Sequence, residues 1–258
     1  MTYSFDADTA LDGGDGHWRA HVREHWFIQR GPNGGLVAAL ATRALTEVAG
    51  GGERAPRSLT LHYLAPPVAG ELEVVAAVER AGRTTTFASL RALQHGVTVA
   101  YGLGCCSAWR EGQPEWDELE RPDVPGPREI PSLERAEAFP FLANYELRPL
   151  GAPRVGAWMR PAQPRPVDPI LLAALTDAWM PAAFAHMEQP RFVPTIDLTI
   201  HWRAPVDAAP GEHPWVLGLF STRLAAGGTW EEDGELWSED GRLLAQSRQL
   251  AIVRGARQ

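Results

Sequence analysis

Asp177 is the residue whose type and surroundings most strongly suggest chemistry. Its neighbours three and four positions away are all apolar, namely Ala173, Ala174, Met180 and Pro181. On a helix, these neighbours would place the carboxylate in an apolar stripe, where an unpaired charge is costly. We therefore expect Asp177 to be either a hydrogen-bonded structural residue or a general base. Pro181 cannot donate to the carbonyl of residue 177, so the helix should kink or end at this acid.

A second candidate feature is the pair Gly34-Gly35, which directly follows Asn33. Asparagine is a favoured N-cap, so the two glycines are predicted to open a helix. Amide groups at a helix N-terminus attract negative charge, and glycine lets a ligand approach the backbone closely. The pair is therefore a candidate oxyanion site. Close packing of the helix against a sheet would explain the same two glycines equally well.

Motifs for other kinds of catalysis are absent from the sequence. No serine lies in a G-x-S-x-G turn, and the Gly-rich stretch before the helix is neither a phosphate-binding loop nor a dinucleotide fingerprint. His17, His21 and His25 recur every four residues, but this stretch also fits a strand, so structural or solvated roles are expected. The adjacent Cys105 and Cys106 are expected to be small residues of a strand. We expect no metal and no cofactor.

The elements that must position these residues occur twice. The segment LTLHYLAP at residues 59–66 recurs as LTIHWRAP at residues 198–205, 139 residues later. A helix precedes each copy. The first is predicted from the N-cap Asn33 to about Ala49, and the second from the N-cap Asp168, with Pro169 in its first turn, towards Met187. Such an internal repeat predicts two similar half-domains.

Strand-like runs joined by tight glycine turns follow each copy of the repeat. We place them at residues 72–78, 84–93, 97–109, 215–224, 229–237 and 243–253. A helix followed by antiparallel strands, twice, is an α+β pattern in which the sheet covers the helix. The segment 111–140 is rich in Pro, Glu and Arg, and this composition predicts a linker between a first half at residues 1–110 and a second at 141–258.

The composition excludes several classes of partner. The formal net charge is -8 and no basic run occurs, so we expect no nucleic-acid binding. No apolar run reaches the roughly 18 residues of a membrane span, and the acidic N-terminus does not look like a signal peptide. We therefore expect a cytoplasmic protein with reduced cysteines. An exposed sheet face could pack on another copy, which favours a homodimer or a larger homo-oligomer.

The order and spacing of these motifs resemble the acyl-CoA thioesterase II family, whose fold is the double hotdog. In that fold, two tandem repeats each wrap an antiparallel sheet around a central helix. The resemblance covers nearly the whole chain and rests on residues 34–37, 58–64, 82–87, 158–160 and 195–197, with Asp177 and Gln249. The chain departs from the family at Ala65, where an arginine is common before the proline, so the contact with CoA or the acyl pocket could differ.

The resemblance implies that an Asp, a Thr and a Gln hold and activate water, and these fall on Asp177, Thr195 and Gln249. Alternation along residues 195–202 raises a difficulty, because it places Thr195 on the face opposite the apolar Ile196 and Leu198. If the apolar face covers the helix, Thr195 points away from Asp177, unless pairing is irregular at the start of the strand.

The resemblance also implies an acyl-CoA substrate and hydrolysis of a fatty or related acyl thioester to free acid and CoA. Two alternatives stay open. One is a non-catalytic acyl-thioester binding protein on the same fold, and the other is a hotdog hydratase or dehydratase. The sequence does not specify the acyl chain, or the choice between CoA and an acyl-carrier protein, because fold does not fix substrate.

Overall fold

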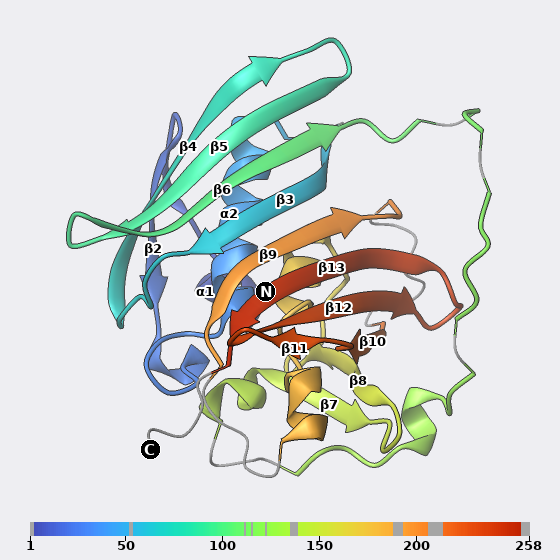
Figure 1. The fold of residues 1–258 in the computed structure, drawn as a ribbon. Coiled ribbons are helices and arrows are strands. Elements are labelled where there is room, and N and C mark those ends of the chain that lie inside the picture. Colours follow the sequence, from blue (N-terminus) through green and yellow to red (C-terminus); the bar gives the residue numbers. More distant parts are fainter. Residues whose placement is uncertain are drawn as a thin grey trace.

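The computed structural model describes residues 3–51, 54–110, 112–114, 116–121, 123–134, 139–187, 193–205 and 214–253. In these ranges an antiparallel sheet of 13 strands curves around the helices α2 (Gly34–Val48) and α3 (Pro169–Leu175), as Figure 1 shows. This is the α+β double hotdog architecture that the sequence predicts. No helix in these ranges is both long and apolar enough to cross a membrane.

The strands of the first half lie at one end of the sheet. From the edge inwards they are β1 (Asp12–Gly14), β2 (His17–Val22), β4 (Gly70–Ala81), β5 (Thr85–Gln94), β6 (Val97–Ser107) and β3 (Ala55–Tyr63). The strands of the second half continue the same sheet. They are β9 (Thr195–Trp202), β13 (Leu243–Ile252), β12 (Thr229–Ser238), β10 (Val216–Ser221), β8 (Val155–Pro161) and β7 (Tyr145–Pro149), and the short β11 (Ala225–Ala226) pairs with β12. The six strands expected after the helices are confirmed to within a few residues.

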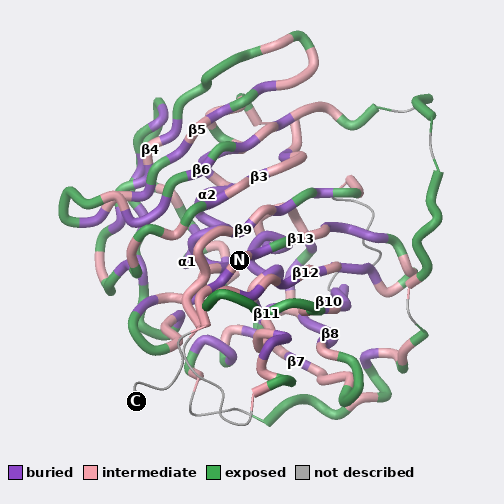
Figure 2. The backbone as a smooth tube through the Cα atoms, viewed as in Figure 1, coloured by how far each residue is buried: buried purple, intermediate pink, exposed green. Residues whose placement is uncertain are grey.

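Among the described residues, five short helical segments lie outside the two central helices. They are α1 (Ser4–Asp8) and the 3-10 turns η1 (Glu24–Trp26), η2 (Pro127–Glu129), η3 (Pro140–Asn144) and η4 (Ala182–His186). The described residues between β6 and η3 cross the outside of the molecule and are mostly exposed, as the green trace in Figure 2 shows. The division of the chain at residues 110 and 140 stays a prediction.

The two copies of the sequence repeat pair with each other at the centre of the sheet. Thr60 of β3 lies directly opposite Thr199 of β9, and their hydroxyl oxygens are 3.0 Å apart. Ser58 pairs with His201 on one side of this point, and His62 pairs with Asp197 on the other. Ser58 and Asp197 occupy equivalent positions in the two repeats, and so do His62 and His201. Each of these residues pairs with the counterpart of the other, so an approximate two-fold axis relates the two halves and passes between Thr60 and Thr199.

Helix α2 forms where the sequence predicts it. The Oδ1 atom of Asn33 accepts a hydrogen bond of 3.1 Å from the amide of Leu36, which is the expected N-cap contact. The helix ends at Val48, just before the glycines at 50–52. Its apolar residues are almost completely buried between the sheet and α3, including Leu36, Leu40 and Leu45.

Helix α3 begins as predicted but is much shorter than expected. Asp168 caps it by accepting from the amide of Leu171, at 2.7 Å, and Pro169 occupies the first helical position. The helix then ends at Leu175 rather than continuing towards Met187. The expectation that it continues towards Met187 was therefore wrong, whereas the break expected at Asp177 is confirmed. Pro181 cannot donate to the carbonyl of residue 177, and η4 starts separately after it.

The two helices approach closely at one point. A Cβ atom at Gly35 would lie 2.4 Å from the carbonyl oxygen of Ala174, so only glycine fits there without a shift of the backbone. This contact places the first turn of α2 against the last turn of α3.

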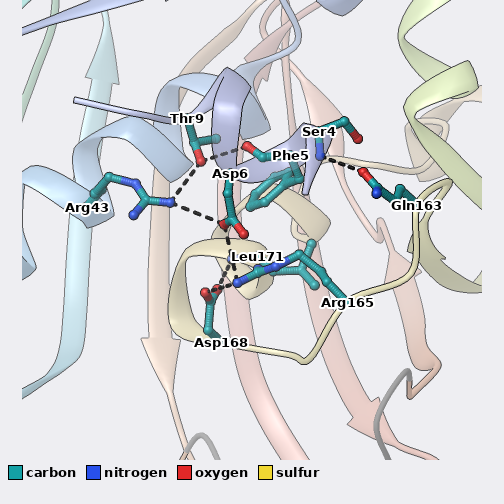
Figure 3. Close-up of polar contacts among 9 residues, drawn as sticks. All are labelled: Ser4, Phe5, Asp6, Thr9, Arg43, Gln163, Arg165, Asp168 and Leu171. Atoms are coloured by element: carbon teal, nitrogen blue, oxygen red, sulfur yellow. Dashed lines mark hydrogen bonds and ion pairs between the residues drawn. The ribbon is translucent and has the colours of Figure 1, made fainter. Parts of the chain in front are cut away.

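The N-terminal helix α1 connects the two halves through charged groups (Figure 3). The Nη2 atom of Arg43 in α2 lies 3.5 Å from Oδ1 of Asp6, and the Nη2 atom of Arg165, from the segment before α3, lies 3.4 Å from the same oxygen. Arg165 also pairs with Asp168, the N-cap of α3. One carboxylate of α1 therefore lies between a cation of each half.

Substitution of Gly35 by alanine should destabilise the protein by about 1–3 kcal/mol, because the new methyl group would overpack the contact with α3. Urea unfolding followed by circular dichroism measures this change. Gly14→Ala is the matched control, since a Cβ atom there meets nothing within 4 Å and stability should stay within about 0.5 kcal/mol. Equal stability of Gly35→Ala and wild type would contradict the close helix contact.

Candidate active site

Asp177 lies two residues after the end of α3, and its side chain is directed at the N-terminus of α2. Its Oδ2 atom accepts hydrogen bonds from the amide of Gly35, at 3.1 Å, and from Nδ2 of Asn33, at 3.2 Å. The same Nδ2 atom donates to the backbone carbonyl of Asp177, at 2.6 Å. Since the amide of Leu36 can only donate, it fixes Oδ1 of Asn33 towards the helix and leaves Nδ2 for Asp177.

Two opposing effects set the proton affinity of Asp177. The residue keeps some accessible surface, but protein atoms surround its carboxylate, and this burial raises the pKa from 3.8 to about 6. The amides of Gly35 and Gly34 act in the opposite direction, because they stabilise the ionised form at the positive end of the helix. The result is a carboxylate that ionises near neutral pH, as a general base requires.

Two tyrosines lie close to this acid. The hydroxyl of Tyr63 donates to the carbonyl of Gly34, at 2.9 Å. Burial is the main reason that the pKa of both Tyr63 and Tyr145 is raised, and the negative charge of Asp177 raises it further. The Tyr145 hydroxyl is buried and has no hydrogen-bond partner among the described residues. Both side chains are therefore neutral.

Thr195 and Gln249 are brought together as neighbours on adjacent strands. The hydroxyl of Thr195 donates to Oε1 of Gln249, at 2.9 Å. A β-bulge makes this possible, because Leu250 pairs with Asp197 whereas Ala251 pairs with Thr195. One extra residue in β9 reverses the alternation there, so Thr195 shares a face with Gln249 and Ala251. The start of β9 is therefore irregular, and this irregularity resolves the difficulty that simple alternation raised for Thr195.

Glu232 of β12 belongs to the same group, although no sequence motif pointed to it. It is 5% exposed. Its Oε1 atom accepts from Nε2 of Gln249, at 2.6 Å, and its Oε2 atom accepts from the amide of Ala182 at the start of η4. Alternation could have revealed it, because Glu232 shares a buried face with the apolar Trp230 and Leu236.

Burial raises the pKa of Glu232 from 4.5 to about 7. The hydrogen bonds from Ala182 and Gln249 oppose this shift, and the negative charge of Asp177 adds to it. The two carboxylates therefore influence each other through space. Among the described residues, no hydrogen bond joins Asp177 directly to Thr195 or Gln249. The site consists of two hydrogen-bonded groups, one around Asp177 and one around Glu232, anchored at residues 177 and 182 of one segment.

The remaining candidates have clear positions. The Gly35 amide is bonded to Asp177, and a Cβ atom at Gly34 would lie 3.0 Å from Oδ2 of Asp177, so glycine at 34 lets the acid approach the helix end closely. His17 and His21 lie on the exposed face of β2. His25 pairs with Asp8, at 2.8 Å, outside this site.

Comparison with known proteins agrees with this fold and covers nearly all of the chain. An uncharacterized protein of Mycobacterium tuberculosis is 27% identical, over 92% of this chain and 90% of the relative. A hotdog-fold protein of unknown function from Alicyclobacillus acidocaldarius superposes with a TM-score of 0.89, at 27% identity and over 100% of both chains. An acyl-CoA thioesterase II from Mycobacterium marinum has the same fold, with a TM-score of 0.76 at 20% identity over 97% of this chain and 98% of that one.

Two family models match the chain consecutively. Residues 22–107 match the acyl-CoA thioesterase N-terminal domain, and residues 110–253 match the acyl-CoA thioesterase C-terminal domain. The chain therefore belongs to the acyl-CoA thioesterase family and is a thioester hydrolase.

Proposed function

We propose that this protein hydrolyses a fatty or related acyl-CoA to the free acid and CoA, with Asp177 as the general base. The observation that carries the proposal is the position of the Asp177 carboxylate, which lies at a helix N-terminus with a pKa of about 6. A carboxylate with this pKa is ionised at neutral pH yet basic enough to accept a proton from an attacking water.

The proposed reaction has two steps. Asp177 removes a proton from water as the hydroxyl oxygen bonds to the thioester carbonyl carbon, which gives a tetrahedral oxyanion. The oxyanion then collapses, the carbon–sulfur bond breaks, and the departing CoA thiolate takes the proton from Asp177. Thr195 and Gln249 hold the water in position through the hydroxyl of Thr195, which Gln249 orients.

The N-terminus of α2 is the proposed oxyanion site. The amide of Gly35 donates to Asp177 and the amide of Gly34 also acts on this carboxylate, so we propose that the Gly34 amide turns to the substrate carbonyl oxygen when the thioester binds. The absence of a side chain at Gly34 lets the thioester reach the backbone. The positive end of the helix would then stabilise both the ionised base and the developing oxyanion.

Asp177→Asn should lower kcat for acyl-CoA hydrolysis by about 100-fold or more with little change in KM, because the amide cannot accept the proton from water. Thiol release from acyl-CoAs of increasing chain length measures this effect and identifies the preferred acyl group. Thermal unfolding of the variant provides the control for folding.

The alternatives make different predictions in the same assay. If neither protein released thiol while acyl-CoA raised the melting temperature, the chain would be an acyl-thioester binding protein. Consumption of an enoyl-CoA without thiol release would indicate a hydratase. Equal turnover by wild type and Asp177→Asn would mean that Asp177 is not the base.

The value of kcat/KM should fall as the pH is lowered through the range of about 7 to about 6. Glu232 and Asp177 take up protons in this range because burial raises the pKa of each, and a protonated Asp177 cannot act as a base. A pH–rate profile from pH 5 to 9 in a constant-ionic-strength buffer tests this expectation. Activity that stays constant down to pH 5 would contradict it.

A further inference from the structure

Glu232 is a buried carboxylate that the proposed reaction does not use, and both of its oxygens are fixed. The amide of Ala182 donates to Oε2, and the side-chain Nε2 of Gln249 donates to Oε1 at 2.6 Å. A backbone N–H and an NH2 group have no acceptor capacity, so both hydrogen bonds run towards the carboxylate. A neutral apolar residue of similar volume would avoid the cost of burying this charge, so the acid calls for a role beyond packing.

The contacts of Glu232 determine which way the Gln249 amide points. An ionised carboxylate can only accept, so it must face the NH2 group of Gln249, and Oε1 must then face Thr195. The Thr195 hydroxyl consequently donates its only proton to Gln249. Its lone pairs are left to accept a hydrogen bond from a water molecule.

We infer that Glu232 is a positioning residue that sets the donor and acceptor directions of the Gln249–Thr195 pair, so that Thr195 accepts from the attacking water. This inference rests on the proposed function. Water has two protons to place, and if Thr195 accepts one, the other faces the base Asp177. The oxygen lone pair is then directed at the thioester carbon.

Glu232→Gln tests the direction of these bonds with almost no change in shape. The Ala182 amide forces Oε1 of the new glutamine towards itself, so its NH2 group faces Gln249. Gln249 must rotate to present its oxygen, and its own NH2 group then donates to Thr195. The Thr195 proton is then released from Gln249 and donates to the water oxygen, which opposes the orientation needed for attack. We expect kcat to fall about 10- to 100-fold with KM unchanged.

The exchanged variant Glu232→Gln/Gln249→Glu is the matched rescue. The new glutamine at 232 accepts from Ala182 and donates to the new carboxylate at 249, which in turn accepts from Thr195. The bonds from Ala182 and from Thr195 regain their original direction, and only the bond between residues 232 and 249 is reversed, so kcat at pH 8.5 should recover at least about fivefold relative to Glu232→Gln. The single variant Gln249→Glu places two carboxylates against each other and should be both less active and less stable.

A double-mutant cycle with Thr195→Val separates positioning from general stability. If Glu232 acts through Thr195, then Glu232→Gln should cost almost nothing further in kcat once the hydroxyl is gone. Additive losses in the cycle would overturn the inference. A kcat of Glu232→Gln within twofold of wild type, or an exchanged variant no better than Glu232→Gln at equal melting temperature, would also overturn it.

A spectroscopic measurement distinguishes failure of this inference from failure of the proposed function. If wild type hydrolyses no acyl-CoA, the proposed function fails, but the bond directions can still be read by NMR. The side-chain amide resonances of Gln249 are identified as the pair lost in Gln249→Glu. We expect one proton of this pair to be shifted by the Glu232 carboxylate, and the shift to disappear in Glu232→Gln. An unchanged pair would overturn the inference.

Discussion

The pairing of β3 with β9 is the constraint on which the rest of the structure depends. It joins the two repeats into one sheet and brings the first turn of α2 against the last turn of α3, where Gly35 touches Ala174. Asp177 of the second half then reaches the N-terminus of α2 in the first half. Asp177 has its partners Asn33 and Gly35 across this boundary, so neither repeat holds the base by itself.

The site balances burial against hydrogen bonding at two acids. Removal from water favours the protonated forms of Asp177 and Glu232, and the donors around each carboxylate favour the ionised forms. At Asp177 these donors belong to a helix end, which is rigid and need not reorganise when charge develops nearby. At Glu232 they are one backbone amide and Gln249, so the second acid is connected to a side chain of the proposed mechanism.

The sequence predicted those features that depend on local rules. Propensity and periodicity predicted the helix caps at Asn33 and Asp168, the strands between glycine turns and the 139-residue repeat. The α+β fold class followed from the order of these elements. Features that depend on tertiary context could not be predicted in the same way. The bulge that turns Thr195 towards Gln249 results from pairing between β9 and β13, and the length of α3 was overestimated even though Pro181 indicated a break. Glu232 was missed although its strand alternates regularly.

The position of β3 at the junction has a consequence for synthesis on the ribosome. The first repeat is complete in sequence long before its partner strand exists, since β9 begins only at Thr195. Until then, β3 must present an unpaired edge to the cell, and such an edge can join to another nascent chain. The contact between Thr60 and Thr199 spans more than half of the chain, so it closes late and slowly. Chaperone demand during translation is therefore expected to be greatest between the emergence of β6 and that of β9.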